Sequence, residues 1–406
     1  MRSGSNDSTC SVLGGVGSVT FSVDPLNEGT HLVGCVEPLP VDGDAHVVGG
    51  RRIGPEQLAD GYPSLGLELS CHDRTIPIGR CGTLRQAERM PKREGDMHRF
   101  WMRRNWRRRT RSGEAGAVTA ELRVPSTDGV DLALHDLGGD GPPLLLCHAT
   151  GFHGRAYLPF VAHLTSAFHV WALDFRAHGA STPPADEYFT WAGMAHDVLA
   201  AVDEINRIDG TPGRALKTFG HSMGGAAILI AELSRPNTFE QAYLYEPIVF
   251  PSGWARSEEQ NSSMSGPARK RREVFASRAE AMWRYASRPP LGGLRADCLA
   301  AYVQYGFDDL PDGTVRLACR AEHEARTFEA AGLMTSDKCA GVKIPVVVAL
   351  GGADAGSNTA QMALPAANTL PYGRLKEYAH LGHFGPLEDP LTVSIDVRET
   401  FGAGSA

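Results

Sequence analysis

The chain has 406 residues, of which 42% are apolar and 21% are charged. No run approaches the ~18 consecutive apolar residues of a membrane span, which excludes a protein built on such spans. The net charge of −7 disfavours nucleic-acid binding along the whole chain, because neutralising phosphates needs a positive surface. The 8 cysteines are too dilute for a disulfide framework and form no C-x-x-C pair. We therefore expect reduced thiols and a cytoplasmic protein.

Residues 1–115 form a leader whose composition differs from that of the rest of the chain. Up to residue 89 its aromatic residues are Phe21 and Tyr62, and no helical or strand periodicity is sustained. A segment with so few large apolar groups does not offset the entropy lost on ordering. The composition therefore predicts a disordered leader.

A basic stretch, residues 92–111, carries nine Lys and Arg against Glu94 and Asp96. Three interpretations are open: a solvated tail, an arm that binds nucleic acid or an anionic membrane, or a gene start set too far upstream. The binding arm is considered because the aromatic residues Phe100, Trp101 and Trp106 lie among the arginines. The upstream gene start is considered because Met90, Met97 and Met102 occur nearby. We favour the interpretations without a binding role, since charge runs are usually solvated. No apolar segment of a secretory signal follows Met1.

Residues 116–406 alternate between short apolar runs and helix-length segments. Strands are predicted at 120–124, 130–134, 144–147, 170–173, 215–219, 242–245 and 346–350. Helices are predicted at 157–168, 191–205 and 225–233. Alternating strands and helices predict an α/β domain with a mostly parallel sheet covered by helices on both faces.

The most informative motif is Gly220-His221-Ser222-Met223-Gly224-Gly225, which fits G-x-S-x-G. It lies between a predicted strand and a predicted helix of small residues. A nucleophilic serine needs such a tight strand-to-helix turn, with glycines where neighbouring backbone passes closely. Ser222 is therefore the candidate nucleophile.

A serine hydroxyl needs a general base, and the base needs an orienting carboxylate. With this motif the expected chain order is serine, acid, histidine. Asp354, after the strand at 346–350, and His383, in Gly-His-Phe near the C-terminus, fit that order. The rival base is His380. The rival acid is Glu246, directly after the strand at 242–245, and we favour Asp354 over it.

Acyl transfer also needs an oxyanion hole with two backbone N–H donors. Met223, directly after the nucleophile, is predicted to provide one. Thr150, in the loop that follows the strand at 144–147, is predicted to provide the other. His148 in this loop is interpreted as a structural residue that ties the loop down.

With these residues in place, the sequence from about Ala117 resembles the α/β-hydrolase superfamily. Four motifs in order carry the resemblance: His148–Phe152, Asp174–Ser181, the turn around Ser222, and the pair Asp354 and His383. Ala149 and Ala177 stand where glycine is usual in the first two motifs, so the oxyanion loop is expected to be reshaped.

The resemblance implies a helical lid after the sixth strand, at about 251–341. Helix-forming runs at 270–287 and 320–331 fit it, and 269–272 is interpreted as a solvated face. Four aromatic residues of this segment are candidates for an apolar pocket, with ordinary packing as the equal alternative: Trp283, Tyr302, Tyr305 and Phe307.

The sequence thus predicts a serine hydrolase that cleaves an ester, thioester or related acyl substrate through an acyl-enzyme. The alternatives are the same triad used for C–C bond hydrolysis, perhydrolase or lyase chemistry, and a non-catalytic small-molecule binder. Neither a metal nor an organic cofactor is implied, and no P-loop motif occurs. The expected partner is a small-molecule substrate, with no nucleic acid and no membrane span.

Overall fold

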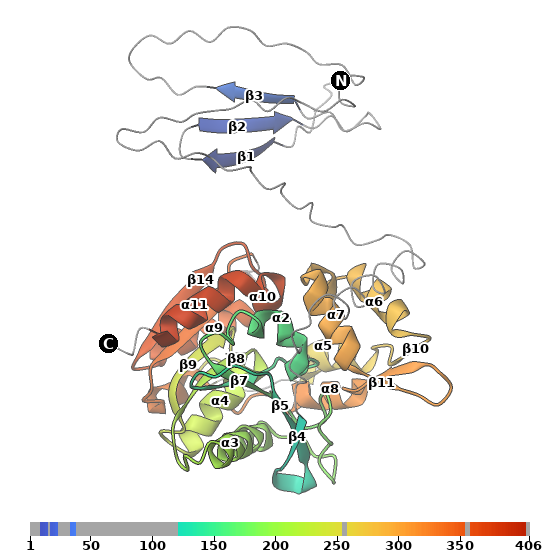
Figure 1. The fold of residues 1–406 in the computed structure, drawn as a ribbon, viewed down its shortest axis with the longest axis vertical. Helices are drawn as coiled ribbons and strands as arrows, with labels where there is room; N and C mark the ends of the chain where they lie inside the picture. The colour runs from blue at the N-terminus through green and yellow to red at the C-terminus, as the bar shows by residue number, and fades with distance from the viewer. Residues whose placement is uncertain are drawn as a thin grey trace. The chain divides into compact units, whose positions relative to one another are not determined.

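The protein is described from a computed structural model, which covers residues 9–14, 17–22, 33–37, 121–253, 258–353 and 358–402. The chain divides into two units, Met1–Leu84 and Arg85–Ala406 (Figure 1). In the first unit, β1 (Thr9–Gly14), β2 (Gly17–Ser22) and β3 (Val33–Glu37) form an antiparallel sheet in that order. The sequence did not predict these strands. The basic stretch 92–111 lies outside the described residues.

The second unit is built on an eight-stranded sheet with the order β14-β13-β9-β8-β6-β7-β5-β4. Its strands are β4 (Glu121–Pro125), β5 (Asp131–Asp136), β6 (Pro143–Cys147), β7 (His169–Asp174), β8 (Leu216–His221), β9 (Phe239–Tyr245), β13 (Val346–Gly351) and β14 (Gly373–Tyr378). Strand β5 runs antiparallel to both of its neighbours, and the pairs from β7 to β14 are parallel. The predicted α/β architecture with a mostly parallel sheet is confirmed.

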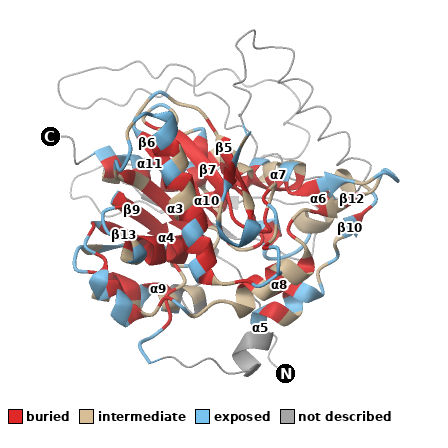
Figure 2. Cartoon of the chain, turned by 90° about the horizontal axis from the view of Figure 1, so that it is seen from below, coloured by how far each residue is buried: buried red, intermediate tan, exposed pale blue. Residues whose placement is uncertain are grey.

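β6 and β13 are continuous apolar runs because helices cover both of their faces. Every residue of β6 and of β13 is buried, and Figure 2 shows the burial concentrated in the inner strands and in α4. One core cluster lies under α3 (Trp191–Ile208), α4 (Met223–Ser234) and α9 (Asn358–Thr369). The other lies under α2 (Leu158–Val161), α11 (Pro390–Gly402) and the segment after β9.

Residues 251–345 form an insertion between β9, the sixth strand of the sheet in chain order, and β13. Its helices are α5 (Glu258–Arg269), α6 (Arg278–Ala286), α7 (Ala296–Tyr305) and α8 (Ala321–Glu329), with 3-10 turns at Leu291–Gly293 and Ser336–Gly341. A small antiparallel sheet of β10 (Val274–Phe275), β12 (Val315–Leu317) and β11 (Phe307–Asp309) accompanies them. The helices were expected here and this sheet was not. No helix in the described part of the chain is both long enough and apolar enough to cross a membrane.

Two predicted helices are shorter than their sequence patterns. A 3-10 turn (Gly154–Tyr157) ends where the segment 157–168 begins, and the segment itself contains the single turn α2 and then irregular turns. The run 270–287 begins with a bend and β10 before α6 starts at Arg278. Ser277 fixes that start, because its side chain accepts a hydrogen bond from the Glu280 amide, as a helix N-cap does.

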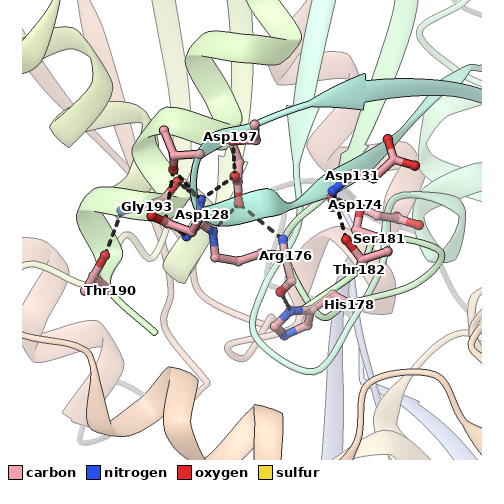
Figure 3. A network of polar contacts seen from close by, with 12 residues as sticks. Asp128, Asp131, Asp174, Arg176, His178, Ser181, Thr182, Thr190, Gly193 and Asp197 are labelled. Carbon is pink, nitrogen blue, oxygen red and sulfur yellow. Dashed lines mark hydrogen bonds and ion pairs between the residues drawn. The ribbon is translucent and has the colours of Figure 1, made fainter. Parts of the chain in front are cut away.

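The turn after β7 is held by a buried polar network, drawn in Figure 3. The guanidinium of Arg176 donates to both carboxylate oxygens of Asp197 at 2.8 Å and to Asp128 at 2.7 Å. Asp174 accepts hydrogen bonds from the amides of Gly154, at 2.7 Å, and Ala180, at 2.9 Å. These bonds join the turn before β5, the segment after β6, the end of β7 and α3, so the motif 174–181 is a structural support in this chain.

Buried histidines should make the unit sensitive to acid. Burial lowers the pKa of His148 to about 3 and the pKa values of His153 and His178 to about 4. Between pH 6.5, the ordinary histidine pKa, and about 4 the unfolded chain therefore binds more protons than the folded chain. The free energy of unfolding is expected to fall as the pH drops through this window, by about 1.4 kcal/mol per pH unit for each histidine.

Urea unfolding at pH 7, 6 and 5 measures this effect. In His178→Asn the loss of stability on acidification should be smaller than in the wild type. In His196→Asn, which changes an exposed histidine of α3, it should match the wild type. Identical pH slopes in all three proteins would contradict the assignment to the buried histidines.

Candidate active site

The parallel strands bring the candidate residues to one edge of the sheet. Ser222 follows β8, Glu246 follows β9, and the loop after β6 begins at His148. The register places His221 beside Tyr245, so the residues after these two strands are neighbours. Ligand sites of open α/β sheets form at this carboxyl edge.

Ser222 occupies a strained turn between β8 and α4. Its backbone angles are φ 56° and ψ −118°, a region that side-chain-bearing residues rarely adopt. A side chain at position 224 would meet the Cys147 carbonyl oxygen at 2.3 Å, so only glycine lets the turn pack against β6. Met223 begins α4, and its N–H therefore has no carbonyl partner within the helix. Ser222 is 7% exposed and lies at this helix N-terminus.

The loop after β6 turns back at Gly151, whose φ is 77°, and the Phe152 amide donates to the Ala149 carbonyl. His148 is fully buried and its Nε2 accepts a hydrogen bond from the Phe175 amide at 3.0 Å. Its Nδ1–H therefore donates to the Ala149 carbonyl, at 2.8 Å. This arrangement matches the predicted structural role of His148. Ala149 does not have a positive φ, whereas Ala177 does, at 61°.

His383 is paired with Glu246. The distance between His383 Nδ1 and Glu246 Oε2 is 2.6 Å, and Glu246 is fully buried. The other carboxylate oxygen of Glu246 accepts the Gly351 amide at 2.9 Å. Burial raises the pKa of Glu246, but the hydrogen bond and charge of His383, together with bonds from Gly351 and Thr359, bring that pKa below its ordinary value. An ionised Glu246 fixes the proton of neutral His383 on Nδ1 and leaves Nε2 as the basic nitrogen.

Asp354, the favoured acid in the sequence interpretation, lies outside the described residues. The rival acid, Glu246, is the one that the structure places on the histidine. The rival base, His380, is largely exposed and lies 3.8 Å from Asp389. Within the described part of the chain, no hydrogen bond joins Ser222 and His383 directly.

A chain of buried hydrogen bonds connects the three loops of the site. The Ala149 amide donates to Tyr157 Oη at 3.3 Å, and Tyr157 Oη–H donates to His221 Nδ1 at 2.7 Å. His221 Nε2–H donates to the His383 carbonyl at 2.8 Å. Burial, with the nearby charge of His383, lowers the pKa of His221 well below its ordinary value, which keeps the ring neutral and able to bridge. Sequence reasoning missed Tyr157 and His221, since their function depends on contacts between distant loops.

Removing the Tyr157 hydroxyl should therefore cost stability. In Tyr157→Phe the Ala149 amide and His221 Nδ1 both lose a buried partner, and the free energy of unfolding should fall by about 2–3 kcal/mol. The matched control is Tyr243→Phe, since the hydroxyl partner of Tyr243, Tyr378, keeps a bond to Asp396. Urea midpoints compare the two variants, and equal losses would contradict the bridging role.

A cavity of about 460 Å³ lies between the insertion and the carboxyl edge of the sheet. It meets the site at Thr150, in the loop after β6, and at Phe384, directly after His383. Aromatic side chains form much of its wall: Phe152, Phe275, Tyr285, Tyr302, Phe328 and Phe384. Ser222 and His383 do not line it. No group of three or more potential metal ligands occurs in the described part of the chain.

The structure bears on two interpretations of the insertion. Of the four aromatic candidates for the pocket, only Tyr302 lines the cavity. Trp283 is partly exposed, and Phe307 packs in the core against Phe275. The run 269–272 is not simply a solvated face, because Lys270, Arg271 and Arg272 line the cavity.

The fold and the placement of these residues define an α/β hydrolase. A model of the alpha/beta hydrolase family matches residues 144–396, and the chain belongs to that family. Two curated relatives match in part. The (E)-2-((N-methylformamido)methylene)succinate hydrolase of Acinetobacter baylyi is 30% identical over 99 residues, 24% of this chain and 35% of the relative. The human protein phosphatase methylesterase 1 is 31% identical over 109 residues, 26% of this chain and 28% of the relative. The matches thus span about a third of each relative.

Solved structures agree on the fold over a longer span. E-2-(acetamidomethylene)succinate hydrolase has a TM-score of 0.56 and 18% identity, covering 70% of this chain and 99% of that chain. A thermophilic esterase from Thermogutta terrifontis has a TM-score of 0.52 and 20% identity, covering 70% of this chain and 98% of that chain. At these identities the likeness shows the fold and leaves the substrate open.

Proposed function

We propose that the protein is a serine hydrolase that cleaves an ester, thioester or related acyl substrate, with Ser222, His383 and Glu246 as its triad. The observation that carries the proposal is the buried Glu246–His383 hydrogen bond of 2.6 Å beside the strained turn of Ser222. A buried carboxylate that selects one histidine tautomer is the arrangement a general base requires. Glu246 replaces Asp354 in the triad that the sequence favoured.

The reaction follows from what each group does. His383 Nε2 accepts the proton of Ser222 as Oγ attacks the carbonyl carbon. The amides of Met223 and Thr150 donate to the oxyanion that forms. His383 then gives the proton to the leaving group, and water attacks the acyl-enzyme by the reverse sequence. Glu246 stays ionised and stabilises the imidazolium. The serine and histidine must approach each other in the substrate complex, as catalytic hydrogen bonds often tighten on binding.

The relatives support hydrolysis as the reaction class. The Acinetobacter relative is named as a hydrolase of a methylene-succinate amide, and the human relative is named as a methylesterase. Both names describe a hydrolytic reaction. We assign the same class of reaction to this chain and leave open whether its leaving group is an alcohol, a thiol or an amine.

Covalent labelling tests the proposal directly. A fluorophosphonate should add its phosphonyl group to the peptide that contains Ser222, read by mass spectrometry. Hydrolysis of p-nitrophenyl esters, from acetate to octanoate, should fall in proportion to the fraction labelled. Ester turnover that survives complete labelling would overturn the assignment. A labelled Ser222 without turnover of any ester would favour the other chemistries of this triad.

A further inference from the structure

The cavity beside the site has a strongly basic lining. Five of its residues carry a positive charge and one, Glu324, carries a negative charge. The basic residues are Lys270, Arg271, Arg272, Arg284 and Arg288. In a chain with a net charge of −7, this is a local reversal of sign.

Two of these cations are already neutralised. Arg271 donates to Glu324 at 2.5 Å and to Tyr302 Oη at 2.8 Å. Arg272 makes a two-pronged pair with Glu280, at 2.6 and 3.0 Å. Both guanidinium groups are therefore held by protein carboxylates. They shape the wall and leave little charge for a ligand.

The surplus charge belongs to Lys270, Arg284 and Arg288. In the part of the chain that the structure describes, neither Lys270 nor Arg288 forms an ion pair with a carboxylate. The charge of Arg284 lowers the pKa of Glu280, but Arg272 already forms the hydrogen-bonded ion pair with that carboxylate. Lys270 and Arg288 are exposed and Arg284 is half-buried, so salt screens their charges, but all three line the same largely apolar cavity. The cavity is therefore suited to an anion.

The rest of the wall defines the body of the ligand. Aromatic rings and Leu291 provide apolar contact, and Thr150 and Phe384 connect the cavity to the reacting groups. A ligand that fills this space places an apolar chain along the rings. It meets the loop of the reacting groups at Thr150, and the cations line the same cavity.

We propose that the natural substrate is an acyl compound whose acyl part carries a carboxylate, held by Lys270, Arg284 and Arg288. The inference rests on the proposed function, because it takes the cavity to be the acyl-binding site of that reaction. It adds a substrate class that the fold does not specify.

A matched pair of esters tests the charge preference. In mono-p-nitrophenyl adipate a carboxylate replaces the terminal methyl group of p-nitrophenyl hexanoate. We expect kcat/KM for the adipate to exceed that for the hexanoate by about 10-fold at low salt. The ratio should fall towards one as ionic strength rises to about 0.5 M. If kcat/KM for the hexanoate equals that for the adipate at low salt, the proposal is overturned.

Charge-removing variants locate the site. Arg288→Gln should lower kcat/KM for the adipate by about 3–10-fold and change that for the hexanoate less than 2-fold. The triple variant with Lys270→Gln and Arg284→Gln added should lose the preference altogether. Arg214→Gln is the control, since it removes an exposed arginine before β8, at the opposite edge of the sheet. A preference that survives in the triple variant would overturn the proposal.

Binding measurements distinguish a failure of the carboxylate-site proposal from a failure of the hydrolase proposal. Adipate should bind to Ser222→Ala protein in calorimetry, and more weakly when the three cations are also removed. Ser222-dependent turnover without a charge preference would overturn the carboxylate site and leave the hydrolase intact. If adipate binding depends on the cations but the fluorophosphonate does not label Ser222 in the wild-type protein, the anion site is upheld and the hydrolase proposal is overturned.

Discussion

Glu246→Gln is expected to lower kcat by about 10⁴-fold, with little change in fold. A glutamine keeps the size of the side chain and can still accept from the Gly351 amide. Its amide group either donates to His383 Nδ1 or accepts from it, without the negative charge that stabilises the imidazolium. The wrong tautomer of His383 then presents a protonated Nε2 to Ser222, and proton transfer fails. Single-turnover rates of a p-nitrophenyl ester measure the loss.

The matched variant is Asp354→Asn, which changes the acid that the sequence favoured. It should lower kcat less than about 3-fold, because the structure places Glu246 on His383 Nδ1. If Asp354→Asn causes the larger loss, the acid belongs to the loop after β13 and Glu246 is a buried structural carboxylate. Comparable losses in both variants would mean that neither holds the histidine alone.

The choice between Asp354 and Glu246 as the acid could not be made from the sequence. Both candidates follow an apolar strand, and chain order favoured the later one. Position along the chain does not say which carboxylate faces the histidine, since β9 and β13 are adjacent in the sheet. Glu246 also has a φ of 42°, so the turn after β9 is bent in a way that composition does not reveal.

The strands of the sheet were predictable wherever helices bury both of their faces. β6 and β13 are unbroken apolar runs, and the predicted ranges lie within or beside the observed ones. β14 was not predicted because it is an edge strand whose residues are all exposed or half-buried, apart from the buried Tyr378. An edge strand carries the polar residues that sequence patterns assign to loops.

The insertion was harder to predict because its elements are short. β10, β11 and β12 have two or three residues each, and the pairing of β10 with β12 joins positions about forty residues apart. No local pattern encodes such a pairing. This affects the site, because β10 directly follows the basic run 269–272, three residues of which line the cavity. The basic lining is therefore a tertiary property.

At Ala177 the sequence differs from the usual family motif, but the backbone keeps the conformation of that motif. Ala177 stands where the family usually has glycine, and the structure keeps the left-handed φ of 61°. The cost of that conformation for a residue with a side chain is roughly 1–2 kcal/mol. Arg176, just before Ala177, is bonded to Asp197, and the amide of Ala180, just after it, donates to Asp174, so both sides of the turn are held in place. The motif therefore keeps its shape without its glycine.

Ser222→Ala and Ser222→Gly should both reduce ester turnover by at least about 10⁴-fold, but they should differ in stability. Alanine keeps the strained angles of φ 56° and ψ −118°, whereas glycine adopts them freely. Relief of strain of order 1–3 kcal/mol outweighs the ~0.5–1 kcal/mol of extra unfolded-state entropy that glycine brings. The Gly variant should therefore be more stable than the Ala variant by about 1 kcal/mol.

Urea unfolding of the wild type and both variants, with the m-value checked for each, measures that difference. The close packing of the glycines and of the helix N-terminus around Ser222 would then be what holds the nucleophile in a strained conformation. If the Gly variant is the less stable, the turn is not strained and Ser222 is exposed to substrate for another reason. If Ser222→Ala keeps the activity of the wild type, the nucleophile lies elsewhere and the catalytic proposal falls with it.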